Sequence, residues 1–480
     1  MAESILIEAL GVPIMLDLAG LTDAETSATR AAWRDAAAPG VRSRGDVLIR
    51  GEEAEDLSAA TQISACVSLV VREPGDDSDL PHLLERLSQR VTLAAITARR
   101  GELWMLHAAG LALPDGRVIV LVGPSGRGKT TASRALGQNL GYVSDETVAM
   151  DADGRVYPYR KPLSIIEGGF PKVQRAPSDL ALGALPDADL HLAAIVLLDR
   201  REDAGDEPVI ETLDLGDALE ELVAQTSYLP DLDRPLQRIA ALIAPLGGVR
   251  RVTYREAESL AAIVDDLVAP VDAVVDVVEA VPGDLAPVAG AGGPAGSDAR
   301  YTRFATADAV GLADPDRIAV MQRDESGAGT VTVLAGIAPA LWRAASGVPI
   351  EVLVDAAVDA YGAPDDGSAA DTVRAAVDEL VAAGLLHEVS DPTWSVRDDV
   401  AWHDSGDRVL VLSLAQPDAV VEDLQGSAAL IWRALGDGHV TTDEVVHRVA
   451  SRAGMEAEVV RVDVETFLLD LERHHVLVRG

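Results

Sequence analysis

The residues best suited to chemistry lie in one glycine-rich segment, GPSGRGKT, which has the spacing G-x-x-x-x-G-K-[ST]. Its glycines let the backbone curl so that successive N–H groups point at phosphate oxygens. Lys129 would bring a point charge to the β- and γ-phosphates, and the Thr130 hydroxyl would bind Mg²⁺. The segment therefore predicts a site for ATP and Mg²⁺ formed by Gly123, Pro124, Ser125, Gly126, Arg127, Gly128, Lys129, Thr130 and Thr131.

The sequence on either side of this segment has the pattern that a phosphate-binding loop requires. Residues 118–122 form an apolar run typical of a buried strand, and the stretch TASRALGQNL after the loop is typical of a helix. The N-terminal partial charge of that helix would favour phosphate. Lysine occurs only at positions 129, 161 and 172, so a chain that otherwise uses arginine keeps lysine where a compact ammonium is wanted. A chance glycine-rich turn is the alternative.

Three more residues are candidates for the same site. His107 lies in an apolar run on the predicted hairpin partner of the loop's strand, where it either packs in the core or reaches the phosphate end. Asp145 and Glu146 end the short strand that follows the loop helix. Phosphate-transfer sites place metal-binding and base carboxylates there, although a solvated acidic turn is the structural alternative.

In their order along the chain, the His–Gly pair, the loop GPSGRGKTT and the segment YVSDE resemble the C-terminal domain of HPr kinase/phosphorylase and its relatives in peptide-biosynthesis clusters. The resemblance covers roughly residues 100–265. It implies an ATP-dependent serine kinase fold related to phosphoenolpyruvate carboxykinase. It also implies that Asp145 is the base, that Glu146 is a metal or water ligand, and that His107 orients groups beside the phosphates. The second acid is Glu where that family has Asp.

Bulk composition narrows the class of partner and the compartment. A formal net charge of −38 argues against nucleic acid and against an anionic membrane surface. Cys66 is the single cysteine, which excludes a disulfide framework and fits a reducing cytoplasm. The N-terminus lacks the basic start of a signal peptide, and no run of about 18 apolar residues is present. We therefore expect a cytoplasmic protein with neither nucleic acid nor membrane as partner.

The chain as a whole divides into predicted domains. Residues 1–268 form an HPr kinase-like α/β domain that begins with a small α/β layer over 1–100, and residues 269–299 form a flexible linker rich in Pro, Gly and Ala. Within the first domain, Leu84–Arg99 has helical spacing and is assigned no chemistry. The pair Arg160–Lys161 either closes over the triphosphate or substrate, or forms a solvated turn.

An internal repeat fills the rest of the chain. The segment around Trp342 matches the segment around Trp432 at an offset of 432 − 342 = 90 residues. Each copy predicts strands, three helices and a closing strand, which is a winged helix-turn-helix; the copies span 300–390 and 405–480. Both tryptophans lie on apolar stripes, so we expect them in the cores.

The repeated motif G-x-A-x-x-[LI]-W-R-A and the terminal Leu-x-x-x-x-[GH]-[LV]-L resemble PqqD-like domains that recognise precursor peptides. The resemblance implies that a leader peptide adds a strand at a sheet edge beside the third helix, with contacts on 407–421 and 458–473. From Ala401 onward, 14 acids face 7 arginines, a net of −7, so the basic stripe of a DNA reader is missing.

Together these features predict an ATP/Mg²⁺-dependent kinase that phosphorylates a Ser or Thr hydroxyl of a ribosomally made precursor peptide, with other peptide-modifying enzymes as further partners. The alternative is a non-catalytic ATP-binding scaffold that delivers the peptide to a partner enzyme. A nucleotide switch that binds DNA through its winged helices is a third alternative, which the acidic charge disfavours.

Overall fold

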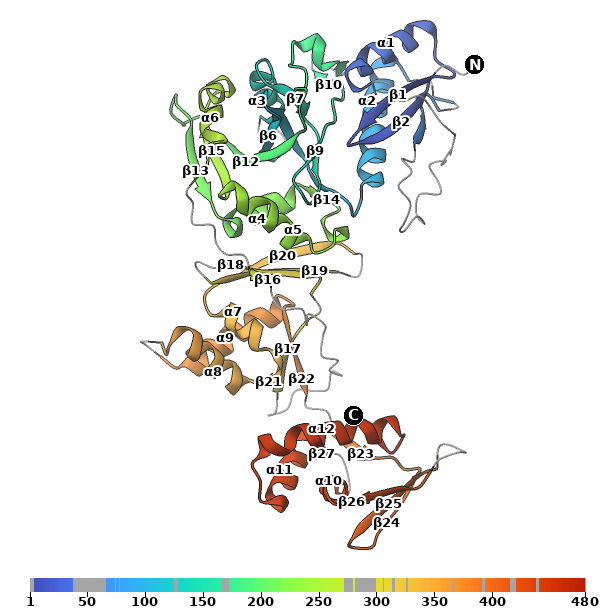
Figure 1. Ribbon diagram of the computed structural model, residues 1–480, viewed down its shortest axis with the longest axis vertical. Coiled ribbons are helices and arrows are strands. Elements are labelled where there is room, and N and C mark those ends of the chain that lie inside the picture. Colours follow the sequence, from blue (N-terminus) through green and yellow to red (C-terminus); the bar gives the residue numbers. More distant parts are fainter. Residues whose placement is uncertain are drawn as a thin grey trace. The chain divides into compact units, whose positions relative to one another are not determined.

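The chain divides into two compact units in the computed structural model (Figure 1). The first unit comprises residues 1–283 and 307–334, and the second comprises 284–306 and 335–480. The structure describes residues 4–37, 66–73, 75–76, 78–124, 128–165, 172–271, 279–280, 299–304, 306–312, 316–324, 327–364, 367–390, 393–414, 420–436 and 440–479. Most of the predicted linker 269–299 lies outside these residues.

The first unit begins with the predicted α/β layer. Strands β1 and β2 pair antiparallel, and β3 adds to β2 in parallel. Helix α2 starts at an Asp79 cap followed by Pro81, and it packs three leucines and Val91 onto this sheet. The elements of the layer are β1 (Ser4–Ala9), β2 (Val12–Asp17), α1 (Asp23–Trp33), β3 (Val67–Val70) and α2 (Leu80–Ala98).

The central six-stranded sheet has the strand order β13-β15-β12-β6-β5-β7. The predicted buried strand is β6 (Arg117–Val122), which pairs with β12 in parallel and with β5 antiparallel. Alternate β6 side chains enter two cores, because successive residues of a strand point to opposite faces. The other strands are β5 (Ala108–Ala112), β7 (Gly141–Ser144), β12 (His191–Arg200), β13 (Val209–Leu213) and β15 (Val249–Tyr254).

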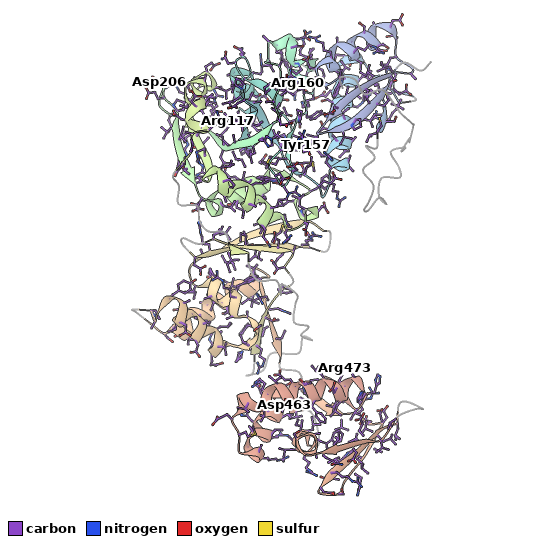
Figure 2. The ribbon with its side chains drawn as sticks, in the orientation of Figure 1. Arg117, Tyr157, Arg160, Asp206, Asp463 and Arg473 are labelled. Carbon is purple, nitrogen blue, oxygen red and sulfur yellow. The ribbon has the colours of Figure 1, made fainter. Side chains whose placement is uncertain are left out.

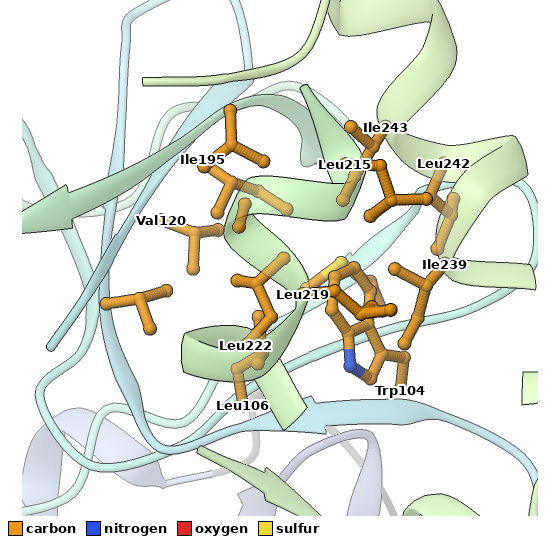
Figure 3. Packing of buried hydrophobic residues seen from close by; sticks show 14 of the residues in the cluster. Trp104, Leu106, Val120, Ile195, Leu215, Leu219, Leu222, Ile239, Leu242 and Ile243 are labelled. Atoms are coloured by element: carbon orange, nitrogen blue, oxygen red, sulfur yellow. The ribbon is translucent and has the colours of Figure 1, made fainter. Parts of the chain in front are cut away.

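Helices cover both faces of this sheet. On one face Val120 and Ile195 pack against leucines of α4 (Leu215–Ala224) and against α5 (Pro235–Ile243), as Figure 3 shows. On the other face, α3 (Lys129–Leu136) packs with the 3₁₀ segment Ala257–Ile263 and α6 (Val264–Leu267). Smaller sheets complete the domain: β4 (Trp104–Leu106), β8 (Val148–Met150), β9 (Val156–Tyr157) and β14 (Thr226–Ser227) form one, and β10 (Leu163–Ile165) and β11 (Val173–Arg175) form another.

A further sheet of the first unit comes mostly from the region predicted as the first winged helix, and its short strand β16 comes from the predicted linker. It has the order β16-β18-β19-β20, and its Val310, Ala319 and Met321 belong to the same core as α4 and α5. The Asp308 carboxylate accepts hydrogen bonds from the first N–H groups of α5, at Leu236 and Gln237. Residues 307–334 therefore group with the nucleotide domain, unlike the predicted boundary at 300. The strands are β16 (Glu279–Ala280), β18 (Asp308–Leu312), β19 (Arg317–Arg323) and β20 (Gly329–Leu334).

Both copies of the repeat have the same order of elements, four strands followed by α-β-α-α-β. Copy 1 contains β17 (Ala299–Arg303), β18, β19, β20, α7 (Ala338–Ala344), β21 (Ser346–Pro349), α8 (Ile350–Tyr361), α9 (Ala369–Ala382) and β22 (Leu386–Ser390). Copy 2 contains β23 (Thr393–Val396), β24 (Val400–Asp404), β25 (Arg408–Ser413), β26 (Glu422–Gln425), α10 (Ser427–Leu435), β27 (Val440–Thr441), α11 (Thr442–Ala453), α12 (Ala457–Arg473) and β28 (Leu477–Arg479). Their strand orders β21-β17-β22 and β27-β23-β28 also correspond. Trp342 and Trp432 are buried, as predicted.

Candidate active site

The predicted phosphate loop runs from the end of β6 to the start of α3. Gly123 and Pro124 follow β6, and Gly128 forms the N-cap of α3, whereas Ser125, Gly126 and Arg127 lie outside the described residues. Gly128 has a φ of +94°, and a Cβ there would also approach the Tyr254 hydroxyl to 3.2 Å, so this position requires glycine. Lys129, the first residue of α3, reaches back so that its Nζ donates to the Gly123 carbonyl oxygen at 2.6 Å.

The acidic pair lies on the turn between β7 and β8. The Ser144 hydroxyl accepts from the N–H groups of Glu146 and Thr147 at 3.2 and 3.3 Å, which fixes the turn. Asp145 is buried, and its Oδ1 accepts a 2.8 Å hydrogen bond from the Tyr142 hydroxyl. Burial raises the pKa of Tyr142, and the charge of Asp145 raises it further, so Tyr142 remains a donor.

Lys161 lies between the two acids. Its Nζ is 3.4 Å from Asp145 Oδ1 and 3.3 Å from Glu146 Oε2, and the residue is only 2% exposed. Burial alone would lower the pKa of Lys161, but the two carboxylates outweigh burial and raise it, so the ammonium stays charged. Lys161 is therefore not part of a solvated turn, and it lines the same cavity as Lys129. Its neighbour Arg160, labelled in Figure 2, donates instead to main-chain oxygens of Tyr142 and Gly183.

His107 lies between β4 and β5, and its main-chain N–H donates to the Gln225 carbonyl oxygen at 2.7 Å. Its Nδ1 is 3.8 Å from Glu146 Oε1, which is an ion-pair distance rather than a hydrogen bond. Burial lowers the pKa of His107, and the charge of Lys129 lowers it further. The imidazole at this position is therefore biased toward its neutral form at neutral pH.

The candidate residues from the loop, the acidic turn and His107 line one cavity of about 650 Å³, a size typical of small-molecule sites. Lys129, Thr130 and Thr131 come from the loop side, Asp145 and Glu146 from the β7–β8 turn, and His107 from the β4–β5 junction. All three lysines of the chain, at 129, 161 and 172, line it together with Arg200. A chain with a net charge of −38 thus concentrates its lysines in a single cavity, where anionic phosphates would be stabilised.

The wall of the cavity includes residues to which the sequence analysis assigned no chemistry. Helix α2 contributes Glu85, Ser88, Gln89, Thr92, Leu93 and Ile96. These positions recur at helical spacing on a face that borders the buried Leu84, Leu87 and Val91, and Ser88 at the boundary is itself buried. That second face was visible in the sequence, but only the fold shows that it borders a cavity.

Oxygen ligands suited to Mg²⁺ are present in the cavity. Mg²⁺ usually binds one or two protein carboxylates and completes its shell with substrate phosphates and water. The Thr130 hydroxyl and the Glu146 carboxylate are such groups, and both line the cavity. Among the described residues, no group of three or more His, Cys, Asp or Glu could hold a metal ion.

The second copy of the repeat carries an exposed apolar stripe. Val459, Val462 and Leu469 lie on one side of α12, and Val462 is 69% exposed. Val420 and Val421 are also exposed, directly before β26, which is an edge strand of the sheet β24-β25-β26. Charged side chains such as Asp463 and Arg473 lie on the same helix (Figure 2). The corresponding helix α9 of copy 1 exposes Thr372, Asp378 and Glu379 instead.

None of the described helices combines the length and the apolar character needed to cross a bilayer.

A comparison with protein families agrees with the resemblance drawn for the second repeat copy. Residues 416–477 match the family described as coenzyme PQQ synthesis protein D (PqqD). No curated protein matches the chain. Among solved structures the chain is similar to the HPr(Ser) kinase/phosphatase from Coxiella burnetii, with 14% identity over 34% of this chain and 93% of that chain, at a TM-score of 0.21. The chain is thus an α/β protein whose residues 416–477 match the PqqD family, whereas a PqqD assignment for the first copy remains a prediction.

Proposed function

We propose that the protein is an ATP/Mg²⁺-dependent kinase that phosphorylates a Ser or Thr hydroxyl of a ribosomally made precursor peptide. The observation that carries the proposal is that Lys129 of the loop and the Asp145–Glu146 pair line one cavity. Phosphoryl transfer requires little covalent chemistry from the protein and depends on positioning and on neutralising charge. The cavity offers both, because Lys129, Lys161 and Lys172 line it together with the acidic pair.

The roles of the individual groups follow from their positions. Lys129 and the predicted N–H groups of the loop would hold the phosphates, and Thr130 and Glu146 would hold Mg²⁺, which would supply positive charge beside the transferred group. The oxygen of the acceptor hydroxyl forms a bond to the γ-phosphorus while the bond from that phosphorus to ADP breaks. Asp145 takes the proton that this hydroxyl loses. Lys161 and Tyr142 keep the Asp145 carboxylate in place. Neutral His107 orients groups beside Glu146.

The second repeat copy would bind the peptide. PqqD-like domains accept a peptide as an added strand, and the exposed edge β26 lies next in sequence to the exposed Val420 and Val421. The apolar stripe of α12 would bury side chains of the peptide. A peptide held on the same chain as the cavity reaches it at a raised effective concentration.

One observation favours the alternative, a non-catalytic ATP-binding scaffold. Asp145 already accepts from Tyr142 and pairs with Lys161, which leaves less of its carboxylate free to take a proton. In that function the nucleotide would regulate delivery of the peptide to a partner enzyme.

Transfer from radiolabelled ATP to a synthetic peptide made from any short reading frame found beside the gene separates the two functions. For a kinase, Lys129→Ala and Asp145→Asn each reduce transfer about 100-fold or more. Val209→Ala, at an exposed position of β13, serves as the unaffected control. Peptide binding without transfer by the wild type would establish the scaffold, and transfer that survives both substitutions would refute the assigned site.

A further inference from the structure

The cavity has two chemically different walls. The loop side contributes Lys129, and Lys161, Lys172 and Arg200 add further positive charge to the lining, whereas the wall formed by α2 itself carries a single charge, at Glu85. Two of its residues, Leu93 and Ile96, are apolar, and Leu93 is 56% exposed although it lies in the middle of a long helix. Phosphates gain nothing from aliphatic side chains, so the α2 wall is unsuited to the triphosphate.

The α2 wall is connected to the acidic pair. The Thr92 hydroxyl donates to the Ser88 carbonyl oxygen and lies 2.9 Å from the Tyr159 hydroxyl, which makes Tyr159 the donor in that second bond. Tyr159 is fully buried; burial raises its pKa, and the charges of Glu146 and Asp145 raise it further. Ser88 and Thr92 line the same cavity as Asp145 and Glu146, so the α2 wall and the two acids belong to one site.

We propose that this face of α2 binds the acceptor segment of the peptide, with an apolar side chain next to the phosphorylated Ser or Thr packed on Leu93 and Ile96. The inference rests on the proposed kinase function and adds a specificity to it. Thr92 sets the position of the helix through Tyr159, and Gln89 offers an amide to the peptide main chain. The preferred occupant is a hydroxyl residue with an aliphatic or aromatic neighbour.

A peptide library tests this specificity with the full-length protein. Each peptide carries one Ser at a fixed central position and randomised residues around it, and label transferred from ATP is read by position. The wild type selects apolar residues beside the Ser. Leu93→Asp loses that selection, and Leu93→Ala raises the KM for an apolar-flanked peptide about tenfold without changing the KM for ATP. Val70→Ala, at an exposed apolar position on β3 outside the cavity, changes neither constant.

The outcomes separate failure of the inference from failure of the kinase assignment. Equal selection by the wild type and Leu93→Asp would overturn the inference and leave the kinase intact. A rise in the KM for ATP alone would also overturn it, because the wall would then hold the nucleobase. If the wild type labels no peptide at all, the kinase assignment fails and the inference fails with it. We expect each variant to keep its fold, because Leu93 is largely exposed. Thermal unfolding of each variant checks this.

Discussion

Lys161 Nζ lies 3.4 Å from Asp145 Oδ1, and neither residue is more than 8% exposed. Two opposite charges withdrawn from water in this way are stable only as a pair, because each compensates the desolvation of the other. The pair also places a fixed positive charge at the carboxylate assigned as base. Lys161 therefore connects the stability of the site to its chemistry.

Lys161→Met is expected to reduce the free energy of unfolding by about 3 kcal/mol, because it leaves Asp145 buried without its cation. Urea unfolding measures the change. Lys172→Met is the matched control, since Lys172 lines the same cavity with a less buried side chain, and we expect a loss of less than about 1 kcal/mol. Equal losses in the two variants would show that the buried pair contributes no more to the free energy of unfolding than the less buried Lys172 does.

The pKa of His107 predicts a dependence of stability on pH. The pKa is lowered in the folded state, so the unfolded chain binds more protons between the folded pKa and the ordinary value of about 6.5. Stability is then fully present above that ordinary value and decreases as the pH falls through the folded pKa. Unfolding of the wild type and His107→Gln at pH 7.5 and 5.5 tests this sign. The variant should lose less stability on acidification; a larger loss in the variant would contradict it.

The loop side of the site could be predicted from the sequence because its residues follow one another along the chain. Strand, glycines, Lys129 and helix are contiguous, and their spacing alone places the ammonium over the loop. Asp145 and Glu146 could be predicted in the same way, as the end of the next strand after the helix. Their arrival in the cavity also required β7 to pair with β5, which the sequence does not specify.

The remaining parts of the site depend on tertiary packing. Lys161 is four residues past β9, and its sequence context is typical of an exposed, arginine-rich turn. The structure shows that its side chain is buried. The polar face of α2 has the pattern of any solvated helix face. The association of β18–β20 with α5 was likewise missed, because the repeat predicts that these strands belong to the winged helix, whereas the Asp308 carboxylate and the apolar face of the sheet join them to the first unit.

Asp308→Ala is expected to reduce the free energy of unfolding by about 2 kcal/mol. Asp308 is 1% exposed and accepts from the N–H groups of Leu236 and Gln237 and from the Gln237 side chain, so its removal leaves buried donors unpaired. The control is Thr441→Ala, which removes the exposed capping box of α11 and should cost about 1 kcal/mol. Denaturant unfolding compares the two. A smaller loss for Asp308→Ala than for the control would rule out a structural role for this carboxylate.

The two repeat copies provide a matched pair for peptide capture. Val462 on α12 is exposed and apolar, and the position 90 residues earlier is the exposed Thr372 on α9. Val462→Asp should raise the Kd for the labelled precursor peptide about tenfold or more, because it places a charge in the surface that buries apolar side chains. Thr372→Asp should leave the Kd unchanged, since α9 lacks an exposed apolar stripe there. Fluorescence anisotropy with the full-length protein measures both. Equal weakening would show that both copies bind the peptide, and no weakening by Val462→Asp would exclude the α12 stripe as the contact surface.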